Sequence, residues 1–181
     1  NRLGGGHQLV RWSTLGAPIV PALARSWTHN EQQTEWTFHL RKGVRWSDGH
    51  PLTAHDFVYH FEVDVLGLNL GMRTLMEVQG QLGTMEAVDD HTLRLRFPVP
   101  NPMLLGKLAV PAWYVGPRHY LERYHPTKGD PALIQASMKA RGLPTPRANY
   151  QALRDPTMNP ERPSLNPWLR RTASDIPPIR F

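Results

Sequence analysis

Residues 21–59 read PALARSWTHNEQQTEWTFHLRKGVRWSDGHPLTAHDFVY, and this stretch joins three local patterns in a fixed order. In the first pattern, Trp36, Phe38 and Leu40 alternate with polar residues. A period of two is typical of a strand that buries one face and exposes the other. The spacing therefore predicts a half-buried strand that ends before Gly43.

A tight turn is the second pattern. Val44 and Trp46 resume the alternation, and Ser47-Asp48-Gly49 follows them. An Asp-Gly pair favours a turn because glycine adopts a positive φ at no steric cost. We interpret Asp48 and Gly49 as a turn pair that reverses the chain, in preference to a catalytic role for Asp48.

The third pattern is the start of a helix. Thr53 stands three residues before Asp56, the spacing of a capping box in which side chain and backbone amide pair reciprocally. A helix is predicted to begin at once. One stripe at helical spacing is predicted to be buried: Ala54, Phe57, Val58, Phe61 and Val65. Four polar residues are predicted to lie mostly outside it: His55, His60, Glu62 and Asp64.

Later segments predict a second hairpin and several short helices. The hairpin would pair residues 82–88 with 92–97 around a turn at 89–91. Helices are predicted over 103–109, 117–124, 131–141 and 148–153, the third between an Asp-Pro start and a glycine stop. We expect an α+β fold in which a small antiparallel or mixed sheet carries helices on one side.

Length and composition agree with one substantial core. The chain has 181 residues and no cysteine, so neither a disulfide framework nor a thiolate metal site is possible. No apolar run approaches the roughly 20 residues of a membrane span. The first residue is Asn1 rather than Met, and no signal sequence precedes the globular pattern. We therefore expect the chain to be a fragment.

The stretch quoted above resembles the family 5 extracytoplasmic solute-binding proteins of bacterial ABC importers, which include oligopeptide-, dipeptide-, nickel- and some oligosaccharide-binding proteins. The matching patterns are P-x-L-A-x-S-W at 21–27 and T-F-x-L-R-K-G-V-x-W-S-D-G-x-P-L-T-A-x-D-F-V-Y at 37–59. A weaker likeness continues through 88–95 and 115–120 to Trp168. The resemblance therefore covers most of the chain.

This resemblance implies a place for the chain in a larger, two-lobed periplasmic-binding-protein type II fold. Residues 1–20 would be a lead-in from the first lobe, and 21–143 an accessory α+β subdomain. Residues 144–181 would be a Pro-rich return segment toward the first lobe, with the second lobe absent. Within the motif, the resemblance and the patterns together predict structural roles for Trp27, Trp36, Phe38, Trp46, Asp48, Gly49, Thr53 and Asp56.

Ligand contacts are implied for the return segment, which in the family runs beside the ligand cleft. Asn166-Pro167-Trp168 replaces the Gly-Pro-aromatic pattern of the family there. Asn166 and Trp168 are the predicted ligand-binding residues, and a core anchor is the alternative for Trp168. The N-P-E-R-P run at 159–163 resembles a divergent subgroup of the family. The sequences of that subgroup determine the ligand poorly, so peptide is only the default solute.

Charge and histidines suggest alternatives that fit less well. Residues 31–100 carry six basic and ten acidic residues, whereas 101–181 carry twelve and five. The later basic residues are scattered, which favours a solvated basic surface over a nucleic-acid site. His50, His55 and His60 recur every five residues, so they cannot share one helical face. We expect no metal site, no cofactor and no catalytic group.

The resemblance thus implies a non-catalytic solute-binding protein. It would capture a peptide or similar small solute outside the cytoplasmic membrane, in the periplasm or at the cell surface, and deliver it to the transmembrane subunits of an ABC permease. Neither nucleic acid binding nor a direct membrane span is expected. The alternative is a standalone interaction or nucleic-acid-binding module that uses a basic surface, and a hydrolase ranks third.

Overall fold

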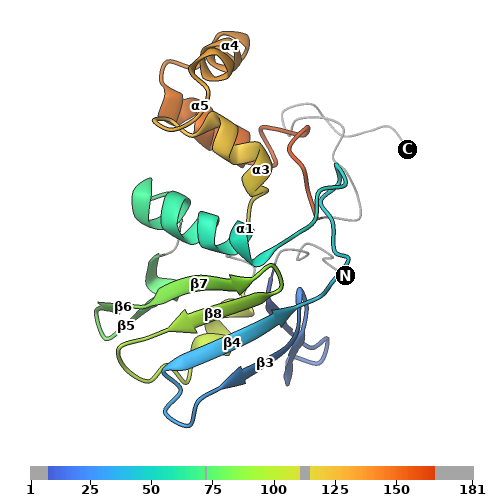
Figure 1. Ribbon diagram of the computed structural model, residues 1–181, viewed down its shortest axis with the longest axis vertical. Helices are drawn as coiled ribbons and strands as arrows, with labels where there is room; N and C mark the ends of the chain where they lie inside the picture. The colour runs from blue at the N-terminus through green and yellow to red at the C-terminus, as the bar shows by residue number, and fades with distance from the viewer. Residues whose placement is uncertain (1–7, 72, 111–114, 166–181) are drawn as a thin grey trace. The chain divides into compact units, whose positions relative to one another are not determined.

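A computed structural model describes residues 8–71, 73–110 and 115–165 of the protein (Figure 1). The chain folds as two compact units, which are described separately. Unit 1 takes the described residues of 1–45 and 51–115, and unit 2 takes those of 46–50 and 116–181. Each unit therefore combines segments that are distant in the sequence.

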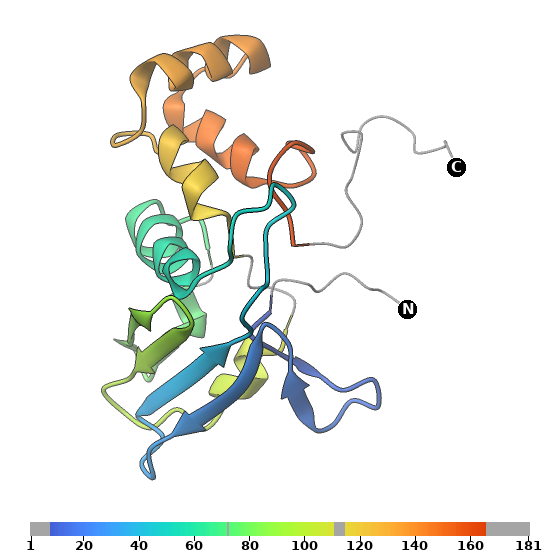
Figure 2. The same cartoon turned by 45° about the vertical axis from the view of Figure 1, so that its right-hand side comes forward.

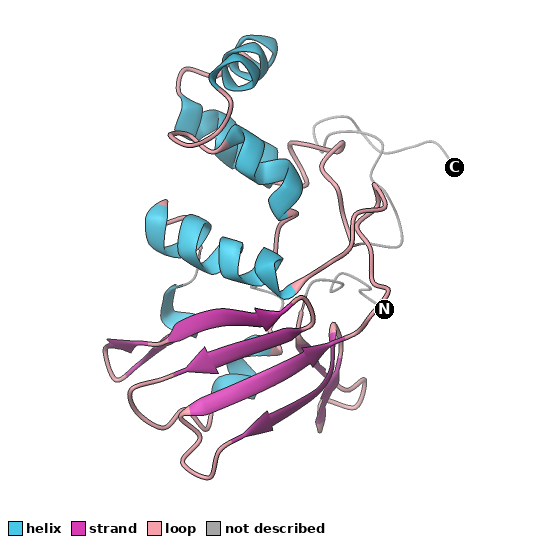
Figure 3. Ribbon diagram, viewed as in Figure 1, coloured by secondary structure: helices cyan, strands magenta, loops and turns pink. Residues whose placement is uncertain are grey.

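A four-stranded antiparallel sheet forms the centre of unit 1 (Figure 3). Its strands lie in the order β3 (Ala24–His29), β4 (Glu35–Leu40), β8 (Thr92–Arg96) and β7 (Thr84–Asp89). Phe38 pairs with Trp27 on one side and with Leu93 on the other. The predicted first strand and the predicted second hairpin are both confirmed.

One face of this sheet is apolar and the other is charged. Trp36, Phe38 and Leu40 are at most 2% exposed, as their period of two predicts. On the other face, Arg96 Nε lies 2.8 Å from a Glu35 carboxylate oxygen, and Arg96 also pairs with Glu86 at 2.6 Å. Opposite charges on adjacent strands thus cover the polar face.

The predicted capped helix forms next to β7 as α1 (Ala54–Tyr59). The backbone amide of Thr53 donates to Asp56 Oδ2 at 2.9 Å. The helix continues as a π-helix, η1 (His60–Gly67). Most of the predicted stripe is buried: Ala54, Phe57, Phe61 and Val65.

Two polar residues of this segment are a correction. His60 and Asp64, predicted to lie mostly outside the buried stripe, are only 4% and 0% exposed. A π-helix hydrogen-bonds over five residues and has a wider turn, so the buried face drifts from an α-helical stripe. His60 Nδ1 and Asp64 Oδ2 lie 3.0 Å apart, so each buried polar group has a partner in the other.

The chain reversal predicted at Ser47-Asp48-Gly49 is confirmed. Strand β4 ends at Leu40, and the following segment forms only an isolated bridge between Arg45 and Pro51. The amide of Leu52 donates to the carbonyl of Val44 at 3.0 Å. The alternation of Val44 and Trp46 therefore marks a segment that makes one short backbone pairing outside the four-stranded sheet.

Smaller elements complete unit 1. Two hairpins were not predicted: β1 (Val10–Trp12) with β2 (Ile19–Pro21), and β5 (Glu77–Val78) with β6 (Gln81–Leu82). Figure 2 shows the first of these hairpins, in dark blue, beside β3. A single 3₁₀ turn, η2 (Arg73–Leu75), precedes β5, and α2 (Leu104–Leu108) confirms the helix predicted over 103–109.

The described part of unit 2 is helical apart from turns and loops. Its elements are α3 (Arg118–Leu121), η3 (Glu122–Tyr124), α4 (Pro131–Arg141) and α5 (Pro146–Arg154). Asp130 caps α4 by accepting from the amide of Ala132 at 2.9 Å, and Gly142 ends it with φ 64°. Both ends agree with the prediction.

Helix α5 begins two residues before the predicted residue 148. The hydroxyl of Thr145 accepts from the amide of Ala148 at 3.1 Å, and Pro146 occupies the first helical position. A proline there loses no hydrogen bond, because the first-turn amides have no helical acceptor. The proline-rich composition of this segment is therefore compatible with a capped helix.

Asn159, the first residue of N-P-E-R-P, joins the helices of unit 2. It is 1% exposed, and its Nδ2 donates to Tyr120 Oη and to the carbonyl of Leu153, both at 3.0 Å. Its Oδ1 accepts from Arg141 Nη2 at 3.1 Å. Burial raises the pKa of Tyr120 despite this hydrogen bond. The side-chain amide of Asn159 thus contacts one residue each of α3, α4 and α5.

The division into two units does not coincide with the predicted subdomains. Residues 116–143 were predicted with the accessory subdomain, but they fold in unit 2 together with α5. The predicted boundaries refer to the lobes of a longer protein and stay predictions. No helix among the described residues is long and apolar enough to cross a membrane.

Candidate functional site

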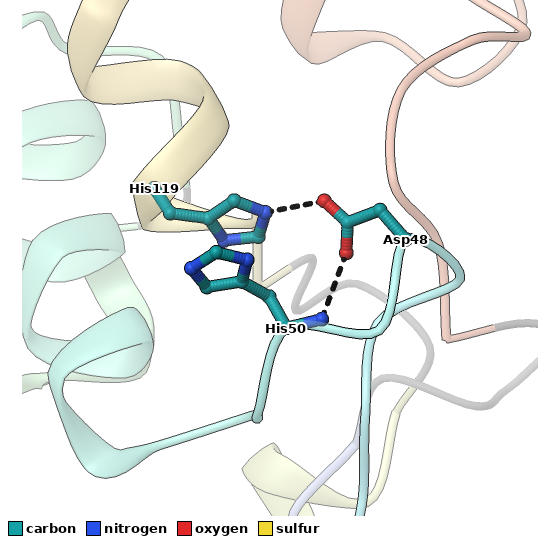
Figure 4. Close-up of side chains that lie close together, drawn as sticks. All are labelled: Asp48, His50 and His119. Carbon is teal, nitrogen blue, oxygen red and sulfur yellow. Dashed lines mark hydrogen bonds and ion pairs between the residues drawn. The ribbon is translucent and has the colours of Figure 1, made fainter.

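Three side chains of unit 2 with ligand-type oxygen or nitrogen atoms lie close together: Asp48, His50 and His119 (Figure 4). One ligand atom from each, a carboxylate oxygen or an imidazole nitrogen, lies within 4.8 Å of the other two. Asp48 and His50 come from the turn after Trp46, and His119 comes from α3. We call these three residues the Asp-His cluster.

The turn that carries two of them is closed by its own hydrogen bonds. The amide of Gly49 donates to the carbonyl of Trp46 at 2.9 Å, and the amide of His50 donates to Asp48 Oδ1 at 3.2 Å. Gly49 has φ +89°, a conformation that residues with a side chain rarely adopt. The Asp-Gly pair therefore forms a turn that orients the carboxylate of Asp48.

Contacts within unit 2 hold this turn in place. The side chain of Trp46 is 2% exposed. The amide of Ser47 donates to the carbonyl of Ser164 at 2.9 Å, and the amide of Ser164 donates to Ser47 Oγ at 3.1 Å. These reciprocal bonds fasten the turn to a segment 117 residues away.

His119 completes the cluster from the first turn of α3. Its Nε2 lies 2.6 Å from Asp48 Oδ2, and the two side chains are 23% and 37% exposed. The His50 ring stacks on the His119 ring, with centroids 3.9 Å apart and an interplanar angle of 8°. Figure 4 shows the carboxylate between the His119 ring and the His50 backbone amide.

The surroundings keep Asp48 ionised. Desolvation raises the pKa of its carboxyl, but the hydrogen bonds from His119 and from the His50 amide outweigh it, so the pKa lies below its ordinary value. The cluster therefore offers an anionic oxygen beside two imidazoles at neutral pH. Such a set can accept hydrogen bonds or hold a cation, and it contains no hydroxyl or thiol nucleophile.

The described residues predicted from the sequence are divided between the two units. Trp36, Phe38 and Trp46 are at most 2% exposed, and Trp27 is half-buried. Thr53 and Asp56 lie at the start of α1. The predicted ligand contacts, Asn166 and Trp168, lie outside the described residues.

The sequence reasoning considered His50 but missed the cluster. It compared His50 with His55 and His60, which belong to unit 1: His55 Nε2 is 3.7 Å from Asp90, and His60 pairs with Asp64. The partner of His50 is instead His119, which stands far away in the sequence. The D-x-H run in the turn was the only local signal, since the third member is supplied by tertiary structure.

Comparison with known proteins places the chain in a family. A model of the bacterial extracellular solute-binding proteins, family 5 (middle region), matches residues 18–139. The chain belongs to family 5 of the bacterial extracellular solute-binding proteins. The resemblance carried by residues 21–59 is thereby confirmed.

Two relatives show how much of a family 5 protein the chain represents. It is 32% identical over 127 residues to the periplasmic oligopeptide-binding protein OppA of Escherichia coli (strain K12), a match that covers 62% of this chain and 23% of that protein. It is also 32% identical over 110 residues to the periplasmic alpha-galactoside-binding protein of Rhizobium meliloti (strain 1021), over 59% and 16% of the two chains. The chain spans a quarter or less of these relatives.

A solved structure supports the fold. The structure of an oligopeptide-binding protein OppA superimposes with a TM-score of 0.78 and 32% sequence identity, and the match covers 92% of this chain and 26% of that chain. The α+β class and the likeness to part of a two-lobed periplasmic binding protein are confirmed.

Proposed function

We propose that the protein is the solute-binding component of a bacterial ABC importer. The observation that carries this proposal is the family match over residues 18–139, together with a fold that covers 92% of the chain on an oligopeptide-binding protein. A protein of this kind binds its solute without chemical change and closes around it by hinge motion. The same family match supports a non-catalytic role.

The proposed solute is a peptide. One relative is named for oligopeptides and another for alpha-galactosides, so membership of the family alone does not select the solute. Extended peptides suit a receptor because backbone hydrogen bonds supply affinity while side-chain pockets tolerate variation. Asn166 and Trp168 remain the proposed contacts on this chain.

The proposed place of action is outside the cytoplasmic membrane. Relatives of the chain are named as periplasmic proteins, which supports a periplasmic or cell-surface location. The proposed partners are the transmembrane subunits of an ABC permease, which would accept the solute from the closed receptor.

Nucleic acid binding is the weaker candidate, and the charge pairing on the sheet of unit 1 argues against this face as its site. The cations of strand β8 are Arg94, which is half-buried, and Arg96, which is exposed. Both pair with the carboxylates of Glu35 and Glu86 at 2.6–3.6 Å. Phosphate binding needs cations that are free to neutralise phosphates and so release the counterions condensed on the nucleic acid. Cations already matched by carboxylates make this face a poor site for nucleic acid.

Solute uptake tests the proposal. Cells lacking the gene are expected to lose most of their uptake of one class of labelled short peptides, and a plasmid copy of the complete reading frame should restore it. A labelled amino acid taken up by another route is the control. Unchanged uptake of every labelled peptide and oligosaccharide would contradict the proposal, whereas neighbouring permease and ATPase genes would support it.

A further inference from the structure

We propose that the Asp-His cluster of unit 2 binds one divalent transition-metal ion, with Zn²⁺ as the reference ion. Asp48, His50 and His119 each offer one donor atom, and these atoms lie within 4.8 Å of one another. The site is independent of the solute that the protein is proposed to carry. It does not depend on the ABC-importer proposal, because it uses only side chains within one unit.

The donor types select the class of ion. Two imidazole nitrogens and one carboxylate oxygen suit zinc, nickel, copper and cobalt, whereas magnesium and calcium prefer oxygen ligands. Three protein ligands also leave a fourth position for water or a small ligand. Arg118, which precedes His119 on α3, has its Nε 3.0 Å from a Glu122 carboxylate oxygen, so this carboxylate partly offsets its charge.

The arrangement is close to a metal geometry but requires side-chain movements. Donor atoms around a tetrahedral zinc ion, with bonds of about 2.0–2.1 Å, are about 3.3 Å apart. The Asp48–His119 contact at 2.6 Å is shorter, and the largest separation in the cluster, up to 4.8 Å, is longer. The donor separations therefore differ from those around a bound ion by up to about 1.5 Å.

The His50 ring must also turn. The donor lone pair of an imidazole lies in the plane of the ring, and the two stacked rings are within 8° of parallel, so their planes do not meet at a nearby ion. His50 is exposed and belongs to a turn, so its side chain can move to another rotamer at small cost. His119, which is anchored in α3, would keep its place.

The existing hydrogen bonds already orient the other two donors. The amide of His50 holds Asp48 Oδ1 at 3.2 Å, so Oδ2 is the oxygen that faces His119 Nε2. An ion bound there would occupy the position of the hydrogen in this contact, and the neutral His119 imidazole would then carry its hydrogen on Nδ1. Backbone support of this kind resembles the outer-shell contacts that fix the ligands of metal sites.

Zinc titration of the metal-stripped protein, prepared without a polyhistidine tag, tests this proposal by isothermal calorimetry. One ion per chain is expected, with an affinity in the micromolar range, and magnesium should give no binding. His119→Gln and His50→Gln should each weaken zinc binding by about tenfold or more. The matched control is His55→Gln, which removes an exposed histidine 3.7 Å from Asp90 and should leave binding unchanged.

A spectroscopic measurement keeps the test independent of folding defects. Zinc should shift the imidazole ¹⁵N resonances of His50 and His119 and leave those of His55 in place. His50 is exposed, so His50→Gln should fold normally and decide the matter even if another variant does not. The proposal is overturned if no zinc binds at about 100 µM, or if His50→Gln binds zinc as well as His55→Gln does.

Discussion

The sheet of unit 1 and the Asp-His cluster of unit 2 are assembled in different ways. The sheet core includes Trp36, Phe38 and Leu40, which occupy every second position of one strand and bury their apolar surface. The cluster joins Asp48 to a histidine 71 residues later through one hydrogen bond of 2.6 Å. Periodic apolar residues therefore mark structure that is visible in sequence, whereas a polar site needs the tertiary fold to bring its members together.

Replacing a sheet aromatic should have the largest effect. Trp36→Ala removes a side chain that is 2% exposed, and we expect a loss of about 3 to 5 kcal/mol in the free energy of unfolding. Urea denaturation followed by circular dichroism measures it. The control is Trp12→Ala, which removes a tryptophan that is 44% exposed. Equal losses from both variants would break the distinction between core and surface aromatics.

A substitution in the turn should lower the free energy of unfolding less than one in the sheet core. Gly49 has φ +89° and open space where a Cβ would stand, so Gly49→Ala adds backbone strain without a clash. We expect a loss of roughly 1–2 kcal/mol. Gly106→Ala is the control, since it also meets nothing within 4 Å and has no positive φ. If Gly49→Ala were neutral in urea denaturation, the turn would not depend on this conformation.

Helix capping in unit 2 gives a smaller expected effect. Asp130→Ala removes the carboxylate that accepts from the amide of Ala132, and we expect a loss of about 1 kcal/mol. Asp130→Asn, which keeps an acceptor, should recover most of it. Thermal unfolding of the two variants compares them, and identical losses would mean that the negative charge matters more than the hydrogen bond.

The smallest effect should come from the pH dependence of Asp48. Its pKa is lower in the folded protein than its ordinary value, so its ionised form stabilises the fold above the unfolded pKa of about 3.9. This contribution is lost as the pH falls through the lowered folded value. Asp48→Asn should therefore be less stable than the parent near pH 7, and the difference should shrink below about pH 4. A difference that grows on acidification would contradict this sign.

The sequence predicted elements whose signals are local. Helix α4 was bounded correctly because Asp130 and Gly142 act within a few residues of its ends. The β5–β6 hairpin was missed because two residues per strand are too few to show a period. The burial of His60 and Asp64 was missed because a π-helix changes the spacing of the buried face.

The candidate site was less accessible to sequence reasoning. The Asp-Gly turn could be predicted, but the partner of Asp48 on α3 depends on the packing of unit 2. The ligand contacts Asn166 and Trp168 came from the family resemblance and remain predictions. Motifs that stabilise a fold are thus easier to predict than contacts that depend on how distant segments meet.

Isothermal titration of the complete gene product with a panel of short peptides and oligosaccharides tests the central claim most directly. The importer account predicts saturable binding of one solute class at micromolar affinity or better, and only weak binding by the 181-residue chain, which spans a quarter or less of its curated relatives. It also predicts that DNA is retained only at low salt. Failure of every solute to bind, together with sequence-selective DNA binding that survives about 0.15 M salt, would contradict it.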